Sequence, residues 1–327
     1  MKGFPSILYN QALAVEFAAK SPFQFRYPPL SVQTEILPLE TAKLPRFAYN
    51  PSIYRMGDKF WMTYRYHRDN LSTRLGIAEI DDVGQALNTQ DLALGPEALS
   101  YEDARLFTLQ GEPWLSWVEA KWDATTLPTA AVKYGKLERD PAWQNPKKDW
   151  KVPRVFHCTA GGNDGQHLQK NWCFFESDEN LFLVHRSWPE YCVLHFQGET
   201  VLNDYKTPGA RWPYGEIRGG NIVPWDGKLL RLFHSSTERG VGAVEKRYYI
   251  GACLMDSKPP FAVLAISKKP ILYGSELLKY DCFHFKANVV FPCGLALAAD
   301  GQSLILALGA NDAACALAKI KPGQLNL

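Results

Sequence analysis

The chain has 327 residues, of which 46% are hydrophobic, and a formal net charge of +2. This nearly balanced charge, without a long block of Lys or Arg, argues against nucleic acid as the main partner, because phosphate backbones are bound by concentrated positive charge. No apolar run is long enough to span a bilayer, and Pro5 and Glu16 interrupt the N-terminal stretch before it resembles a secretory signal, so we expect a cytoplasmic protein.

The seven cysteines lie mostly within apolar runs, and no two of them are spaced as Cys-x-x-Cys. This pattern favours buried, reduced thiols over disulfides or zinc ligands. The seven histidines show no spacing that is typical of metal ligands. We therefore expect no bound metal and no resident cofactor.

The first 40 residues are predicted to form a lead-in segment. The Pro-rich stretch RYPPLSVQTEILPLETAKLP, at residues 26–45, is expected to wrap around the first unit of the domain that follows. No linker rich in Pro, Gly or Ser divides the rest of the chain, so we expect a single domain over residues 41–322.

Within that domain, a polar turn followed by an apolar run recurs five times. The turns contain Gly, Asp or Glu and suit tight hairpins, and the runs are rich in strand-forming residues. A second apolar strand follows each copy, often with small residues such as Gly76 and Gly251 that allow close packing. The copies begin at residues 56, 109, 177, 225 and 299 and read MGDKFWMTYRYH, LQGEPWLSWVEA, SDENLFLVHRSW, WDGKLLRLFHSS and ADGQSLILALGA.

Five such units predict an all-β fold, specifically a five-bladed β-propeller. The units are roughly 50 to 75 residues apart, which is more than in ordinary propeller repeats, so insertions between strands are expected to build a site. The alternative is an irregular pair of β-sandwiches.

Polar residues gather next to these predicted strands. In a propeller the innermost strands begin at one end of a central channel, where residues distant in sequence can converge. Taken singly, each is better explained as a solvated strand end or a turn former. The candidates are Asn50, Ser52, Arg65, Asp103, Arg105, Lys170, Asn171, His185, Arg218, His234 and Asp312. Five of them fall in different predicted blades: Arg65, Asp103, Lys170, His234 and Asp312.

Two adjacent carboxylates, Glu102 and Asp103, stand at the start of the second unit. In an extended strand alternate residues share a face, so Asp103 and Arg105 are expected to face one way and Glu102 the other. One acid would then face a site while its neighbour is held within the structure.

Several short motifs occur in a recognisable order. They are Asn50-Pro51, Tyr64-Arg65, residues 102–105 (Glu-Asp-Ala-Arg), Lys170-Asn171 and residues 290–294 (Val-Phe-Pro-Cys-Gly). Together they resemble glycoside hydrolase family 130, whose members are five-bladed propeller enzymes that act on β-linked mannosides, many by phosphorolysis. Ala104 replaces the proline of the family's Glu-Asp-Pro-Arg motif, which indicates a divergent member.

The resemblance implies that Asp103 is the general acid, which protonates the glycosidic oxygen through a hydroxyl group of the bound mannose. Inorganic phosphate, the co-substrate, would attack the anomeric carbon from the opposite face and give α-mannose 1-phosphate. Phosphate contacts are implied for Arg65, Lys170 and a histidine, either His185 or His234. Contacts to the sugar are assigned to Asn50, Ser52, Arg105, Asn171, Arg218 and Asp312.

Two other functions remain open on the same scaffold. A phosphate nucleophile needs clustered cations and no second carboxylate, whereas an inverting hydrolase needs a base about 6.5 to 9.5 Å from the acid. Glu176, Glu216 and Asp281 are the candidates for that base. The third alternative is a propeller that binds glycans without catalysis. The expected partner is a small β-mannoside or an oligosaccharide, with no nucleic acid and no membrane, and a homo-oligomer is left open.

Overall fold

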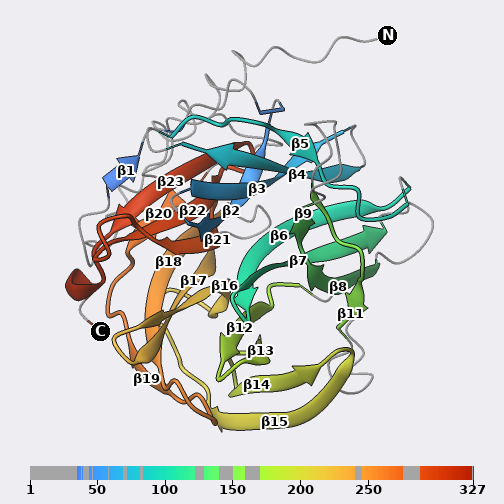
Figure 1. Cartoon of the computed structure of the whole chain (residues 1–327). Helices are drawn as coiled ribbons and strands as arrows, with labels where there is room; N and C mark the ends of the chain where they lie inside the picture. Colours follow the sequence, from blue (N-terminus) through green and yellow to red (C-terminus); the bar gives the residue numbers. More distant parts are fainter. Residues whose placement is uncertain are drawn as a thin grey trace.

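The computed structural model describes residues 35–37, 39, 44–45, 47–57, 59–68, 72–81, 84–96, 98–121, 129–139, 150–158, 170–239, 245–274, 288–325 and 327. These residues form mainly β-strands, in five sheets of four or five strands and one short two-stranded ribbon. Figure 1 shows the five sheets arranged around a common centre. The predicted five-bladed β-propeller is confirmed, and the alternative pair of sandwiches is wrong.

Each blade runs from an innermost strand at the centre to an outermost strand at the rim. The first blade is β2 (Tyr49–Met56), β3 (Lys59–His67), β4 (Thr73–Ile80) and β5 (Gln90–Asp91). The second is β6 (Ser100–Leu109), β7 (Glu112–Lys121), β8 (Thr129–Lys136) and β11 (Phe156–His157). The third is β12 (Cys173–Ser177), β13 (Asn180–Arg186), β14 (Glu190–Gln197) and β15 (Thr200–Pro208).

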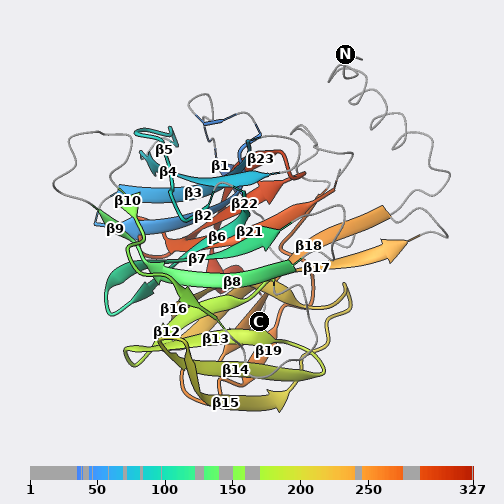
Figure 2. The same cartoon turned by 90° about the vertical axis from the view of Figure 1, so that its right-hand side faces the viewer.

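The fourth blade is β16 (Arg218–Trp225), β17 (Lys228–Arg239), β18 (Glu245–Met255) and β19 (Val263–Ile266), with β20 (Leu272–Tyr273) also paired to β18. The fifth is β21 (Val290–Leu297), β22 (Leu304–Ala310), β23 (Ala314–Ile320) and β1 (Glu35–Leu37). The ribbon is β9 (Glu138–Arg139) with β10 (Trp150–Lys151), and a 3-10 turn, η2, covers Pro322–Gln324. In Figure 2 the hairpin of β17 and β18 extends beyond the other strands on one side of the propeller.

The five repeated sequences are the hairpins between the first and second strands of the five blades. Three of their turns have positive φ at both central residues, at Gln110-Gly111, Asp178-Glu179 and Asp226-Gly227. This is the backbone of a type I′ turn, whose twist matches that of the strands it joins. The second apolar segment after each repeat forms the third strand of the blade, as predicted.

Small residues make room for aromatic rings on the neighbouring strand. Gly76 pairs with Tyr64, and a Cβ atom on Gly76 would lie 2.4 Å from Cζ of that ring. Gly251 pairs with Phe233 in the same way, and a Cβ atom there would lie 2.5 Å from Cζ. The close packing predicted for these glycines is therefore packing of a ring over a bare backbone.

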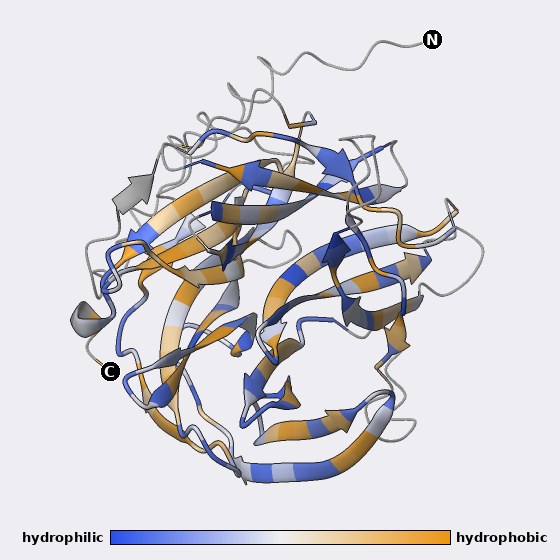
Figure 3. Ribbon diagram, viewed as in Figure 1, coloured by the Kyte–Doolittle hydropathy of each residue, from blue (hydrophilic) through white to orange (hydrophobic). Residues whose placement is uncertain are grey.

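The core lies between neighbouring blades and within the sheets. Strands β22 and β23 are almost entirely buried and mainly hydrophobic (Figure 3). Six free cysteines are buried as well, as the sequence predicts: Cys158, Cys173, Cys192, Cys253, Cys293 and Cys315. The seventh, Cys282, lies outside the described residues. Within the described part of the chain there is no helix of sufficient length and hydropathy to cross a membrane.

The first and last of the strands that the structure describes close the ring together. β1 pairs antiparallel with β23, with Glu35 opposite Lys319 and Leu37 opposite Leu317. β1 lies inside the predicted lead-in segment, but it completes the fifth blade instead of wrapping around the first. The innermost strands then contact one another in the order β2, β6, β12, β16, β21 and back to β2.

Candidate active site

The innermost strands begin with irregular backbone. The register shifts between Tyr49 and Ser52 on β2, and again where β6 and β16 begin. Such bulges insert an extra residue and redirect its side chain. Positive φ values occur where four inner strands begin. They are 48° at Asn50 on β2, 50° at Asp103 on β6, 63° at Asn171 just before β12, and 54° and 102° at Gly219 and Gly220 on β16. Asn, Asp and Gly are the residues that tolerate this left-handed region best.

The bulge on β6 brings both acids to one side. Glu102 pairs with Val118 and Arg105 with Ser116, so two residues of β6 lie opposite one residue of β7. Oε1 of Glu102 lies 3.1 Å from Nη2 of Arg65, and Oδ1 of Asp103 lies 3.3 Å from Nη1 of the same guanidinium. The predicted alternation, with Glu102 facing away from Asp103, is wrong because the extra residue breaks the two-residue period.

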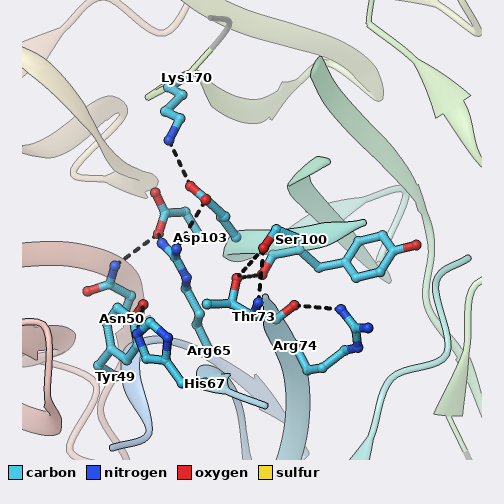
Figure 4. A network of polar contacts seen from close by, with 11 residues as sticks. Tyr49, Asn50, Arg65, His67, Thr73, Arg74, Ser100, Asp103 and Lys170 are labelled. Carbon is cyan, nitrogen blue, oxygen red and sulfur yellow. Dashed lines mark hydrogen bonds and ion pairs between the residues drawn. The ribbon is translucent and has the colours of Figure 1, made fainter. Parts of the chain in front are cut away.

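Asp103 lies among cations and is partly accessible, with 13% of its side chain exposed. Its Oδ1 accepts hydrogen bonds from Nδ2 of Asn50 at 2.9 Å and from Arg65 (Figure 4). Burial raises the pKa of Asp103, but the charges of Arg65, Lys170 and Arg105 and the Asn50 hydrogen bond outweigh it, so that the pKa lies below its ordinary value. The resting side chain is therefore a carboxylate.

Lys170 joins this group from the third blade. Its Nζ lies 2.7 Å from Oε2 of Glu102, and 27% of the lysine side chain is exposed. Arg65 on β3, Asp103 on β6 and Lys170 just before β12 thus lie in one group. The propeller prediction expected such convergence of residues from different blades. Glu102 is the member of this group that sequence reasoning missed. The available signal was the recurrence of Asn, Asp or Gly where inner strands begin, since these residues favour bulges.

Arg65 is held on its other side by an aromatic ring. Its guanidinium lies 5.1 Å from the ring centroid of Tyr49. The hydroxyl of Tyr49 is 3.1 Å from Nε2 of His67, whose ring also stacks on Tyr49 (Figure 4). Arg65 and His67 therefore share one face of β3, as their two-residue spacing predicts. The negative charge of Asp312, in the turn between β22 and β23, also acts on Arg65.

Arg105 ties the second blade to two others. Its Nη1 donates to the carbonyl oxygens of Gly220 at 2.8 Å and Pro292 at 3.0 Å, and the residue is 5% exposed. These contacts to the backbone of β16 and β21 make Arg105 mainly a link between blades. Its Nη2 is buried and has no hydrogen-bond partner among the residues that the structure describes.

His234, on β17, lies beside Arg105 and is 2% exposed. A Cβ atom on Gly219 would lie 3.2 Å from both Nδ1 of His234 and Nη2 of Arg105, so both atoms face the space left by this glycine. Burial, together with the charges of Arg105 and Arg218, holds the pKa of His234 well below its ordinary value. His234 is therefore neutral near pH 7 and offers a hydrogen bond, not a positive charge.

Three other predicted site residues, Ser52, His185 and Arg218, make contacts outside the cluster of Asp103, Arg65 and Lys170. Ser52 is fully buried, and its Oγ accepts the backbone N–H of Leu106 at 2.8 Å, so it joins the first two blades instead of facing a substrate. His185 lies against the ring of Trp172, with the two ring centroids 5.0 Å apart. Trp172 directly follows Asn171 in the chain. Arg218 donates from Nη2 to Oγ of Ser236 at 2.8 Å.

Of the three candidate bases, two can be located. Glu176 lies at the far end of β12, where its carboxylate accepts the backbone N–H of Gln110 at 2.9 Å in the hairpin of the second blade. This placement excludes it as a base for a site at the other end of the strand. Glu216 lies 4.0 Å from Nε of Arg218, with 58% of its side chain exposed. Asp281 lies outside the described residues.

Comparison with known proteins gives matches in sequence and in fold. Residues 218–325 match the family model of glycoside hydrolase family 130, described as beta-1,4-mannooligosaccharide phosphorylase. A beta-1,2-mannobiose phosphorylase from Listeria innocua is 34% identical over 112 residues. That match covers 34% of this chain and only 29% of the relative's length.

Solved structures of similar proteins share the fold over most of the chain. A beta-1,2-mannobiose phosphorylase from Listeria innocua, in complex with beta-1,2-mannobiose, has a TM-score of 0.60 at 15% identity, over 91% of this chain and 93% of that one. The mannose phosphorylase MPT-4 from Leishmania mexicana, in complex with phosphate ion, has a TM-score of 0.58 at 14% identity, over 96% and 93%. Residues 218–325 thus match glycoside hydrolase family 130 in sequence, and the chain shares its five-bladed fold with these solved structures.

Proposed function

We propose that the chain is an inverting β-mannoside phosphorylase. The observation that carries this function is the convergence of one acid, Asp103, with Arg65 and with the Glu102–Lys170 pair, from three different blades. Arg65 and Lys170 would bind and orient phosphate, because clustered cations neutralise a phosphate and direct its attack. The phosphorylases among its relatives support the same activity.

The reaction breaks the bond between the anomeric carbon and the glycosidic oxygen and forms a bond from that carbon to a phosphate oxygen. The leaving oxygen takes a proton that Asp103 supplies through a sugar hydroxyl, and the proton lost by phosphate balances it. Asp103 must be protonated for this step, although its resting pKa is low. A bound phosphate dianion would offset the charges of Arg65 and Lys170 and so raise that pKa toward the working range.

The test is to incubate the protein with β-1,2-mannobiose and β-1,4-mannobiose, the linkages named for the relative and the family model, with and without phosphate. A phosphorylase gives a sugar 1-phosphate from at least one of them, and only in the presence of phosphate. Cleavage at the same rate without phosphate would refute the proposal. Using both substrates also identifies the linkage.

An inverting hydrolase is the second candidate, and one observation favours it. Arg65 and Lys170 are already paired with Glu102, and the exposed Glu216 lies beside Arg218 at the end of the propeller where β16 begins. In that case Glu216 would activate water. Glu216→Gln should then abolish release of free mannose, whereas it leaves the rate of a phosphorylase within a few fold.

A further inference from the structure

Glu102 joins two cations from different blades. Its two oxygens are divided between them, with Oε1 at 3.1 Å from Nη2 of Arg65 and Oε2 at 2.7 Å from Nζ of Lys170. Only 3% of the Glu102 side chain is exposed, so this carboxylate is desolvated and depends on the two cations for its stability. The three side chains form one ion cluster across the first three blades.

The same cluster limits how an anion can bind. Nη1 of Arg65 already contacts Asp103, and its Nη2 contacts Glu102, so both ends of the guanidinium face carboxylates. A phosphate that binds both Arg65 and Lys170 has to share or replace the contacts that Glu102 makes. It also comes close to the negative charge of Glu102, which is poorly screened because the side chain is buried.

We propose that Glu102 is an internal counter-ion of the phosphate site, which holds Arg65 and Lys170 in place before phosphate binds and weakens the binding of phosphate when it arrives. This inference rests on the proposed phosphorylase function. Glu102 acts through the two cations, so it is a positioning residue. Phosphate carries more charge than a carboxylate and has more acceptor oxygens, so it can satisfy both cations at once.

The bulge at Asp103 supports a specific role for this arrangement. In a regular strand, Glu102 and Asp103 would lie on opposite faces. Asp103 instead takes a φ of 50°, and its carboxylate and that of Glu102 contact the same guanidinium. This backbone conformation is uncommon for a residue other than glycine, and its consequence is that two carboxylates contact Arg65.

The test compares two substitutions by calorimetric titration with phosphate, with sulfate as an unreactive dianion. Glu102→Gln keeps the shape and one acceptor but removes the charge, and it should bind phosphate at least tenfold more tightly than the unaltered protein. Glu102→Asp keeps the charge but is shorter, and it should not bind more tightly. In steady-state assays Glu102→Gln should lower KM for phosphate and leave KM for the mannoside within about twofold, a split that loss of structure would not produce.

Phosphate affinity in Glu102→Gln that equals or falls below that of the unaltered protein would overturn the inference and leave the phosphorylase proposal standing. If the unaltered protein binds no phosphate, the proposed function itself fails, and the inference fails with it. A structure of the unaltered protein with phosphate tests the same point without a substitution. The phosphate should contact both Arg65 and Lys170 beside Glu102, and a phosphate bound away from both cations would contradict the inference.

Discussion

Asp103→Asn is the substitution that most specifically removes the proposed proton donor. Asparagine has the same shape, and its side-chain oxygen can still accept the hydrogen bonds that Asn50 and Arg65 donate to Oδ1. General acid catalysis contributes typically 10²- to 10⁴-fold to a rate. We therefore expect kcat for β-mannoside cleavage to fall by about 10²- to 10⁴-fold, which corresponds to about 3 to 5 kcal/mol of transition-state stabilisation.

The effect on stability should be much smaller. The gross attraction between Asp103 and Arg65 at 3.3 Å is about 5 kcal/mol at an effective dielectric constant of 20, but a cost of desolvating the carboxylate offsets most of it. Arg65 also keeps Glu102 as a partner in the variant. We expect a net loss of about 1 kcal/mol, because asparagine keeps both hydrogen bonds and loses only the added strength that a charged acceptor gives them.

The assay measures initial rates with saturating mannoside and phosphate, together with thermal unfolding and phosphate binding. Asp204→Asn is the matched control, because Asp204 pairs with Lys206 on the exposed strand β15. Phosphate binding should persist in Asp103→Asn, since Arg65 and Lys170 remain. If the variant keeps more than about a tenth of the kcat of the unaltered protein, Asp103 does not supply the 10²-fold or greater effect of a general acid.

Ser52→Ala should lower stability by about 1 to 3 kcal/mol, because the buried N–H of Leu106 loses its acceptor, while KM for the mannoside stays unchanged. A raised KM at unchanged Tm would instead make Ser52 a substrate contact. His234→Gln should reduce the loss of stability between pH 7.5 and 5.5. In the unaltered protein the unfolded state binds a proton below its pKa of about 6.5 that folded His234 does not, so stability falls by up to about 1.4 kcal/mol per pH unit. Identical pH dependence in thermal melts would contradict this. Gly309→Ala would place a Cβ atom 2.0 Å from Oδ1 of Asn50, so kcat should fall by about 10- to 100-fold as the Asn50 contact with Asp103 is displaced. Unchanged kcat would show that Asn50 is not needed there.

The architecture was predictable because its signals are local. Each hairpin carries turn residues that can adopt positive φ, such as Gly111 and Asp226, next to a run of strand formers. These turns occur five times and fix the number of blades. The pairing of β1 with β23 had no such signal, since a strand of three residues gains its partner only when the ring closes.

The site was predicted in outline and differs in its details. Convergence of Asp103 with Arg65 and Lys170 follows from blade geometry, but the face of Glu102 does not, because one bulge reverses the alternation. Ser52 is a polar residue of the innermost strand β2, as Asn50 is, yet its hydroxyl accepts a hydrogen bond from the backbone of Leu106 in the neighbouring blade. Sequence marks which polar residues lie near the centre; whether each faces substrate or backbone depends on the contacts between blades.

The most direct measurement is product analysis by nuclear magnetic resonance as β-mannobiose is cleaved at increasing phosphate concentrations. The account predicts that mannose 1-phosphate appears first in the α configuration, at a rate that rises with phosphate and saturates, and that no cleavage occurs without phosphate. Free mannose formed from both halves of the disaccharide, at a rate that phosphate does not change, would contradict it.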